Sequence, residues 1–130
     1  MAERYLIDSS AVIKHLAEVF PIKGISFMDA VVDVECNISF ITEIELLAWN
    51  SPNPSDIIIY KEFIGASEII WVNESIIQQT IAIRKNQKLK IPDAIIAATS
   101  IVNDLTLVAD NDHDFLKVPG LKYINPASMV

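Results

Sequence analysis

Five short, mostly apolar runs alternate with longer segments of helical period along this chain. Each run is only a few residues long and is apolar at neighbouring positions, as in strands that are covered on both faces. We expect strands at residues 5–7, 38–40, 69–72, 105–109 and 121–124. Strands that alternate with helices predict an α/β fold of three layers, α/β/α, with a short and mostly parallel sheet of about five strands.

The intervening segments predict helices because their apolar residues recur every three or four positions. We expect these helices at residues 10–20, 24–34, 41–49, 56–64, 74–85 and 92–102. Two expected buried faces are Ile41, Ile44, Leu47 and Ala48 in the third helix, and Ile76, Ile77, Ile81 and Ala82 in the fifth. The length of 130 residues, without an internal repeat or linker, predicts one domain over residues 1–130.

Composition argues against several classes of protein. No apolar stretch reaches the roughly 18 residues that a membrane span needs, and the first residues lack the pattern of a secretion signal. We therefore expect a soluble cytoplasmic protein without membrane contact. The single cysteine, Cys36, cannot form an internal disulfide and is expected to be a buried, inert thiol. A formal net charge of −7 argues against coating of nucleic acid by bulk charge, although an acidic metal site would raise that count locally.

Acidic residues occur where the expected elements begin or end. Asp8 follows the first strand, Glu45 lies early in the third helix, Asp93 lies at the head of the sixth, and residues 110–112 follow the fourth strand. Ligands of open α/β sheets bind outside the carboxyl ends of the strands, so these carboxylates can converge there. Converging carboxylates repel one another unless a cation lies between them, and oxygen ligands suit Mg²⁺ or Mn²⁺. The pattern predicts a metal site.

Each acid also has an ordinary structural interpretation. Asp8 could cap a helix, although Ser9 or Ser10 could supply that cap instead. Glu43 and Glu45 point about 200° apart on a helix, and both gain from the helix dipole, so periodicity does not separate them well. An aspartate such as Asp93 is common in a first helical turn. Spacing does not choose among the acids that follow the fourth strand, which are Asp110, Asp112 and Asp114 with Asn111 and His113 between them.

Four of the ten basic residues lie within seven positions just before Asp93, namely Arg84, Lys85, Lys88 and Lys90. They could be a solvated helix end, where cations complement the dipole. They could also form a patch that steers phosphates toward the metal site.

Three segments carry a resemblance to a known family. Tyr-Leu-Ile-Asp-Ser-Ser at 5–10, Ile-Thr-Glu-Ile-Glu-Leu-Leu at 41–47 and Ile-Pro-Asp-Ala-Ile-Ile-Ala-Ala-Thr at 91–99 resemble the main motifs of PIN-domain proteins, above all the VapC-type toxins of toxin–antitoxin modules. Residues 105–115 and 124–126 are also similar to that family, so the resemblance spans nearly the whole chain. It departs from the family pattern at Ala109, where a Thr or Ser is usual.

The resemblance implies cleavage of RNA with Mg²⁺ or Mn²⁺. It implies that Asp8 and Asp93 are the principal metal ligands and that Glu45, rather than Glu43, completes the shell or orients the attacking water. Asp110 or Asp112 would hold a second ion through water. The basic residues Arg84, Lys85, Lys88 and Lys90 would help to bind single-stranded RNA.

The resemblance also implies two protein partners, a second copy in a homodimer and a cognate antitoxin. Antitoxins of this family commonly lay a helix into an apolar groove, for which the helix around Trp49 and residues 55–64 are the candidate contact regions.

Two other functions were weighed. A PIN-like fold whose site has decayed would leave a module that binds protein or RNA, and Ala109 keeps this alternative open. A phosphoacceptor receiver domain would need adjacent acids after the first strand and an Asp after a middle strand, where this chain has Ser9 and Asn73.

Overall fold

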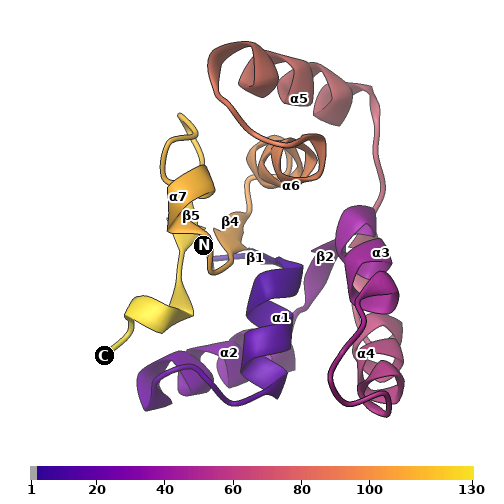
Figure 1. Ribbon diagram of the computed structural model, residues 1–130. Coiled ribbons are helices and arrows are strands. Elements are labelled where there is room, and N and C mark those ends of the chain that lie inside the picture. The colour runs from indigo at the N-terminus through magenta and orange to yellow at the C-terminus, as the bar shows by residue number, and fades with distance from the viewer. Residues whose placement is uncertain (1–2) are drawn as a thin grey trace.

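A computed structural model describes residues 3–130 and contains a parallel sheet of five strands in the order β3-β2-β1-β4-β5 (Figure 1). The strands are β1 (Tyr5–Ile7), β2 (Asn37–Ser39), β3 (Glu68–Ile70), β4 (Thr106–Val108) and β5 (Tyr123–Ile124). All four strand pairings are parallel. The expected α/β architecture with a short five-stranded sheet is therefore confirmed.

Seven α-helices connect and follow the strands. They are α1 (Ser9–Leu16), α2 (Ile22–Val34), α3 (Phe40–Ala48), α4 (Asp56–Gly65), α5 (Glu74–Asn86), α6 (Ile91–Val102) and α7 (Asp112–Phe115). A short 3₁₀ turn, Pro126–Ser128, follows β5. Within the described range, none of these helices combines the length and the apolarity that crossing a membrane requires.

The sheet separates two apolar cores because neighbouring residues of a strand point to opposite faces. Leu6 of β1 packs on the side of α5 and α6, and Ile7 packs on the side of α1 to α4. Leu107 and Val108 of β4 divide in the same way. Helices thus cover both faces, which confirms the expected three layers.

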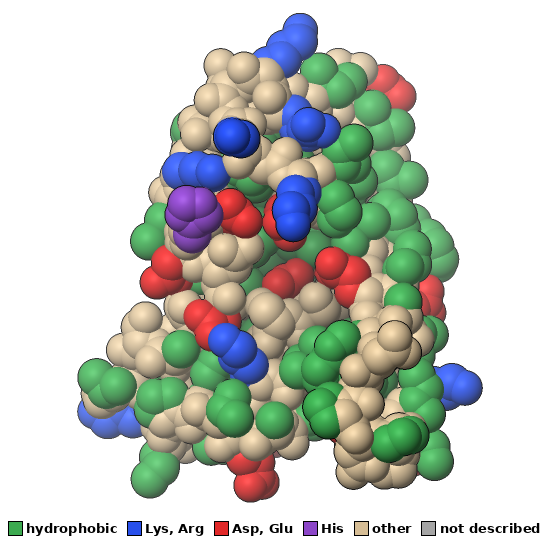
Figure 2. All heavy atoms as spheres, in the orientation of Figure 1, with side chains coloured by type: hydrophobic (Ala, Val, Ile, Leu, Met, Phe, Trp, Pro, Cys, Tyr) green, Lys and Arg blue, Asp and Glu red, His purple; other side chains and the backbone are tan. Residues whose placement is uncertain are grey.

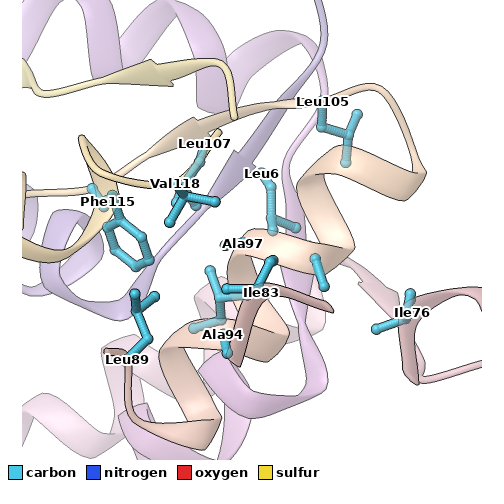
Figure 3. Packing of buried hydrophobic residues seen from close by; sticks show 13 residues of the cluster. Leu6, Ile76, Ile83, Leu89, Ala94, Ala97, Leu105, Leu107, Phe115 and Val118 are labelled. Atoms are coloured by element: carbon cyan, nitrogen blue, oxygen red, sulfur yellow. The ribbon is translucent and has the colours of Figure 1, made fainter. Parts of the chain in front are cut away.

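Small side chains bring α6 close to the sheet. Ala94, Ala97 and Ala98 are fully buried, and Figure 3 shows Ala94 and Ala97 on the same side of the sheet as Leu6 and Leu107. The consequence of this close approach is that the first turn of α6, which carries Asp93, lies near the ends of the central strands.

The predicted buried faces of two helices were wrong at most positions, although Ile76 is buried and Ile41 packs against the core as expected. In α3 the buried residues are Thr42 and Leu46, whereas Ile44 and Leu47 are exposed. In α5 the buried residues are Ile76 and Ile83, and the expected inward residues Ile77, Ile81 and Ala82 face solvent. Both helices carry more apolar residues than one buried stripe can hold, so apolarity alone could not identify the inner face.

The first helix is also shorter than predicted. It ends at Leu16, and Glu18 takes a left-handed backbone conformation with φ of 58°. A residue in this conformation stops a helix, so Val19 is exposed while Phe20 turns back into the core.

Candidate active site

The candidate site lies where the strand order reverses. From β1 the chain adds β2 and β3 on one side and β4 and β5 on the other, and such a switch point is the usual ligand position in open α/β sheets. Asp8 follows β1 directly, and its backbone N–H donates to the carbonyl of Val108, 2.9 Å away, at the end of β4. The sheet thus fixes Asp8 at the carboxyl edge beside this switch point.

Asp8 is a buried carboxylate with only 6% of its surface exposed. It is the N-cap of α1, and its Oδ2 accepts hydrogen bonds from the backbone N–H and the hydroxyl of Ser10, at 3.3 and 2.7 Å. Burial raises the pKa of Asp8, and the hydrogen bonds from Ser10 and Ser9 offset only part of that effect. Asp8 itself therefore supplies the cap that the sequence had left to Ser9 or Ser10.

Glu45 reaches the same edge from α3. Its Oε1 accepts a hydrogen bond from the Ser9 hydroxyl at 3.0 Å. Burial raises the pKa of Glu45 most, and the negative charges of Asp8 and then Asp93 raise it further. Glu45 therefore lies within electrostatic range of the other two acids.

Asp93 completes this group from the first turn of α6. Its pKa is raised by burial first, then by the charges of Asp8 and Asp114, while Lys90 lowers it. Asp93 is therefore a third carboxylate within electrostatic range of Asp8. Asp114 of α7 is also within electrostatic range of Asp93.

Asp8, Glu45 and Asp93 lack a positive partner. Over residues 3–130, none of the three forms an ion pair. Figure 2 shows acidic side chains gathered in a hollow at the centre of one face. Uncompensated carboxylates that are partly removed from water favour either protonation or a bound cation.

The donor set fits a hydrated divalent ion rather than a closed cage. Among the described residues, no group of three acidic, histidine or cysteine side chains is arranged so that it could hold a metal ion by itself, and water would have to supply the remaining ligands. Mg²⁺ usually keeps several water ligands and is bound through one or two carboxylates, so an open arrangement of oxygen donors suits it.

Asp110 and Asp112 belong to a different polar network. Asp110 pairs with Lys14 and accepts a hydrogen bond from Asn125 at 2.8 Å, and these two contacts lower its pKa. Asp112 accepts hydrogen bonds from the Tyr123 hydroxyl at 2.7 Å and from Asn125 at 2.9 Å. Their carboxylates are therefore engaged by the side chains of α1, β5 and the residue after β5.

Asp114 is held by the short helix α7. Asn111 caps this helix by accepting from the Asp114 backbone N–H at 3.3 Å, and its amide donates to Asp114 Oδ2 at 3.0 Å. Lys117 Nζ lies 3.6 Å from Asp114 Oδ1. The spacing of Asn111 and Asp114 is that of a helix cap and its third residue, a signal that could have predicted both the helix and the orientation of Asp114.

Ser9 and Ser10 are the polar residues whose role the sequence missed. The sequence indicated only helix caps at these positions. In the structure the Ser9 hydroxyl donates to Glu45, and Ser10 contacts residues that follow both β1 and β4. The Ser10 hydroxyl donates to Asp8 and accepts from the backbone N–H of Asp110 at 3.1 Å. Two hydroxyls after a strand-ending acid are thus positioned to orient it and its neighbours.

The predicted basic cluster is divided by the structure. Arg84, Lys88 and Lys90 line a cavity together with His113 and Lys117, next to Asp114. Lys85 lines a different depression with Ile81 and Ile91, which Arg84 also borders. The two histidines lie outside the acidic group, His113 at this cavity and His15 beside Asp29, with Nε2 3.0 Å from Oδ1.

Comparisons with known proteins agree with this fold. A family model for the PIN domain matches residues 5–121. No curated protein sequence is significantly similar to the chain.

Solved structures match over nearly the whole chain. A toxin–antitoxin complex from Klebsiella pneumoniae contains a chain that is 26% identical, with a TM-score of 0.73 and coverage of 94% of this chain and 97% of that chain. DNA-bound VapBC from Salmonella typhimurium is 21% identical, with a TM-score of 0.77 and coverage of 96% and 99%. VapBC2 from Rickettsia felis, bound to a DNA fragment from its promoter, is 20% identical, with a TM-score of 0.76 and coverage of 93% and 97%.

Proposed function

The chain belongs to the PIN-domain family, and from this premise we propose that it is a metal-dependent endoribonuclease and the toxin of a toxin–antitoxin pair. The observation that carries the proposal is the group formed by Asp8, Glu45 and Asp93. These three acids come from remote parts of the chain and lack an ion-pair partner among the described residues, and the charge of Asp8 raises the pKa of both Glu45 and Asp93. Perturbed carboxylates in a hollow are typical of catalytic sites.

The proposed metal ligands are Asp8, Asp93 and Glu45. When bound there, Mg²⁺ or Mn²⁺ would supply an activated water and a counter-charge for the scissile phosphate. Asp8 is fixed by its two hydrogen bonds from Ser10, and Asp93 by the first turn of α6. The backbone positions of both acids are therefore set by the fold.

Glu45 has a further proposed role as the group that orients and deprotonates the attacking water. Ser9 donates to one of its oxygens, and no protein hydrogen bond among the described residues occupies the other. Its raised pKa brings the carboxylate closer to the range in which a general base works best near neutral pH.

For the fourth acid we propose Asp114 in place of Asp110 or Asp112. The charge of Asp114 acts on Asp93, whereas Asp110 is compensated by Lys14 and Asp112 is hydrogen-bonded to Tyr123. An acid already balanced by a lysine is a poorer ligand for a second ion than one that faces the cluster.

A matched pair of variants on α3 tests this function. Purified wild-type protein should cut single-stranded RNA with Mg²⁺ or Mn²⁺ and stop on addition of EDTA. Glu45→Gln should lose most of the activity, whereas Glu43→Gln, two residues away on the same helix, should keep it. Cleavage that persists in EDTA and in both Asp8→Asn and Asp93→Asn would reject the proposal. A decayed site that only binds partners would show no heat of divalent-ion binding by calorimetry.

The proposed antitoxin contact is a groove between α1 and the segment that joins α3 to α4. It has a volume of about 240 Å³, and its apolar lining includes Ile13, Leu16, Trp49, Ile59 and Tyr60. Leu16 and Trp49 are each 39% exposed, so part of this apolar lining is open to a partner. A groove of this kind accepts the apolar face of an amphipathic helix.

The solved relatives include toxin–antitoxin complexes, which supports an antitoxin as the occupant of this groove. Leu16→Asp and Ile59→Asp should abolish capture of the cognate antitoxin. Val19→Asp, at an exposed position outside the groove lining, should leave it intact.

A second copy of the chain is the other proposed partner. Ile77 and Ile81 on α5 and Ile91 on α6 are 42%, 43% and 55% exposed, although the sequence predicted the first two to face inward. A homodimer through this face would cover them. Ile81→Glu should then shift the protein from dimer to monomer in light-scattering measurements without reducing its helical content.

A further inference from the structure

A basic cavity adjoins the acidic site on one flank only. It has a volume of about 580 Å³ and lies between the end of α5, the loop into α6 and the short helix α7. Leu89 is buried, and the basic side chains at its border are Arg84, Lys88, Lys90 and Lys117, with His113 beside them. Four of the ten basic residues of an acidic protein thus surround one hollow.

Most of this positive charge is uncompensated. Among residues 3–130, neither Arg84, Lys88 nor Lys90 forms an ion pair, and all three side chains are exposed. Lys117 is held in place, because its Nζ donates to the backbone carbonyl of Lys88 at 2.7 Å and lies 3.6 Å from Asp114. Lys117 thereby joins α7 to the loop before α6 and closes the border of the cavity.

The cavity and the acidic site share a boundary. Asp114 lines the cavity and also raises the pKa of Asp93, and Lys90 at the same border lowers it. Figure 2 shows the same arrangement, with Lys and Arg side chains above the acidic hollow on the side of α5 and α6. On the flank formed by α1, by contrast, Lys14 is neutralised by Asp110.

We propose that this cavity is a subsite for a backbone phosphate of single-stranded RNA, next to the phosphate that is cut. This inference rests on the proposed nuclease function. It adds the direction in which the RNA strand leaves the acidic site, because the strand is bound on the flank of α7 and not on the flank of α1. Exposed cations without protein partners are the groups that bind nucleic-acid phosphates, and such contacts do not depend on base sequence.

The structure also separates the residues of this subsite from their neighbours in the sequence. Arg84 and Lys88 line the cavity, and Arg84 also borders the neighbouring depression, whereas Lys85 lines only that depression, with the apolar residues Ile81 and Ile91. Lys85 is therefore a control of equal charge, because it lies beside Arg84 in the last turn of α5 and does not line the cavity.

Binding can be measured apart from cleavage with a mixed-sequence single-stranded RNA of about ten nucleotides and an Asp8→Asn background, which keeps a side chain able to cap α1. In that background the double variant Arg84→Gln/Lys88→Gln should weaken binding about tenfold. It should also reduce the slope of log K against log salt by about 1.4, since each lost contact to a single strand removes about 0.7. Lys85→Gln should change binding less than twofold.

A scan of neutral methylphosphonate linkages along the same RNA tests the direction. A neutral linkage at one position, on one side of the cleaved phosphate, should weaken RNA binding to the Asp8→Asn protein. The same linkage should not weaken binding further when Arg84 and Lys88 have been replaced. The subsite would be overturned if the double variant and Lys85→Gln lost equal RNA affinity. It would also be overturned if every linkage that weakens binding to the parent protein weakened binding to the double variant as well.

Failure of the subsite and failure of the nuclease give different results. If wild-type protein cuts RNA with Mg²⁺ but the double variant binds and cuts like Lys85→Gln, the nuclease stands and the subsite is rejected. If the subsite binds RNA but wild-type protein does not cut it, the nuclease is rejected alone. Loss of binding to an acidic peptide, with RNA binding unchanged, would assign the cavity to a protein ligand and overturn the proposal.

Discussion

Asp8 and Asp110 follow neighbouring parallel strands at the same edge of the sheet, yet their environments shift the pKa of the two carboxyls in opposite directions. Ser10 contacts both residues, through the carboxylate of Asp8 and the backbone N–H of Asp110. Burial raises the pKa of Asp8, whereas Lys14 lowers the pKa of Asp110. Position at a strand end therefore does not by itself identify a functional acid. The presence or absence of a protein cation distinguishes the two.

This difference has an energetic meaning. A buried carboxylate without a partner opposes folding when it is charged, because the folded protein replaces its water with a poorer environment. The group of Asp8, Glu45 and Asp93 carries that cost at the switch point, whereas the charge of Asp110 is compensated by Lys14. Such an uncompensated group is useful only where an external cation or a proton completes it.

The largest expected difference is in catalysis. Asp93→Asn should lower the rate of RNA cleavage by about 10³-fold or more, because several kcal/mol of transition-state stabilisation depend on the bound metal. Asp110→Asn should lower it by less than about tenfold, since each factor of ten requires about 1.4 kcal/mol. Single-turnover cleavage at saturating Mg²⁺ measures both. Equal losses in the two variants would place Asp110 in the catalytic group and remove the distinction.

The next largest expected difference between Asp8 and Asp110 is in metal binding. At a free Mn²⁺ concentration of about one hundred times its dissociation constant, wild-type protein should gain about 2.7 kcal/mol of stability. Asp8→Asn should lose most of this gain, and Asp110→Asn should retain it. Thermal unfolding with and without Mn²⁺ provides the measurement. Retention of the full gain in Asp8→Asn would show that the ion binds elsewhere.

Much of the fold could be predicted from the sequence because it depends on local patterns. Short apolar runs gave every strand to within two residues at each end, and the helical period located the starts of α5 and α6 to within one residue. The convergence of Asp8 and Asp93 was also predictable, since both lie at the carboxyl edge of a parallel sheet.

The remaining features depend on long-range packing. No periodicity could show that Thr42 and Leu46, rather than Ile44 and Leu47, face the core, because the apolar residues of α3 surround much of the helix. The pairing of Lys14 with Asp110 joins residues that are 96 positions apart. Only the folded chain shows which acid meets a lysine and which does not, and this pairing is what separates Asp110 from the candidate site.

In EDTA, Asp8 and Asp110 should make the free energy of unfolding depend on pH with opposite signs. The pKa of Asp8 is raised, so between its ordinary value and the raised value the folded state holds the extra proton. The free energy of unfolding then falls as pH rises through this window, by at most about 1.4 kcal/mol per pH unit for each such group. Asp8→Asn should therefore be more stable than wild type at neutral pH without metal.

For Asp110 the sign is reversed. Its pKa is lowered, so its contribution to stability is present above the ordinary aspartate pKa and is lost as pH falls through the lowered value. Asp110→Asn should destabilise the protein at neutral pH and have little effect once the pH lies below the lowered pKa of Asp110. Denaturant titrations across pH measure both. A variant Asp8→Asn that is less stable than wild type at neutral pH in EDTA would contradict the view that Asp8 is uncompensated.

The smallest expected effect concerns Lys14 itself. Its side chain is 44% exposed, so solvent screening should keep the loss of stability in Lys14→Gln below about 1 kcal/mol. The informative result is the state of Asp110, whose pKa should return toward its ordinary value once the lysine is removed. Carbon-detected NMR titration of the Asp110 carboxyl can follow this change. If the pKa of Asp110 stays low in Lys14→Gln, hydrogen bonding from Asn125 rather than the lysine balances this acid, and a cation is not what separates the two sides of the edge.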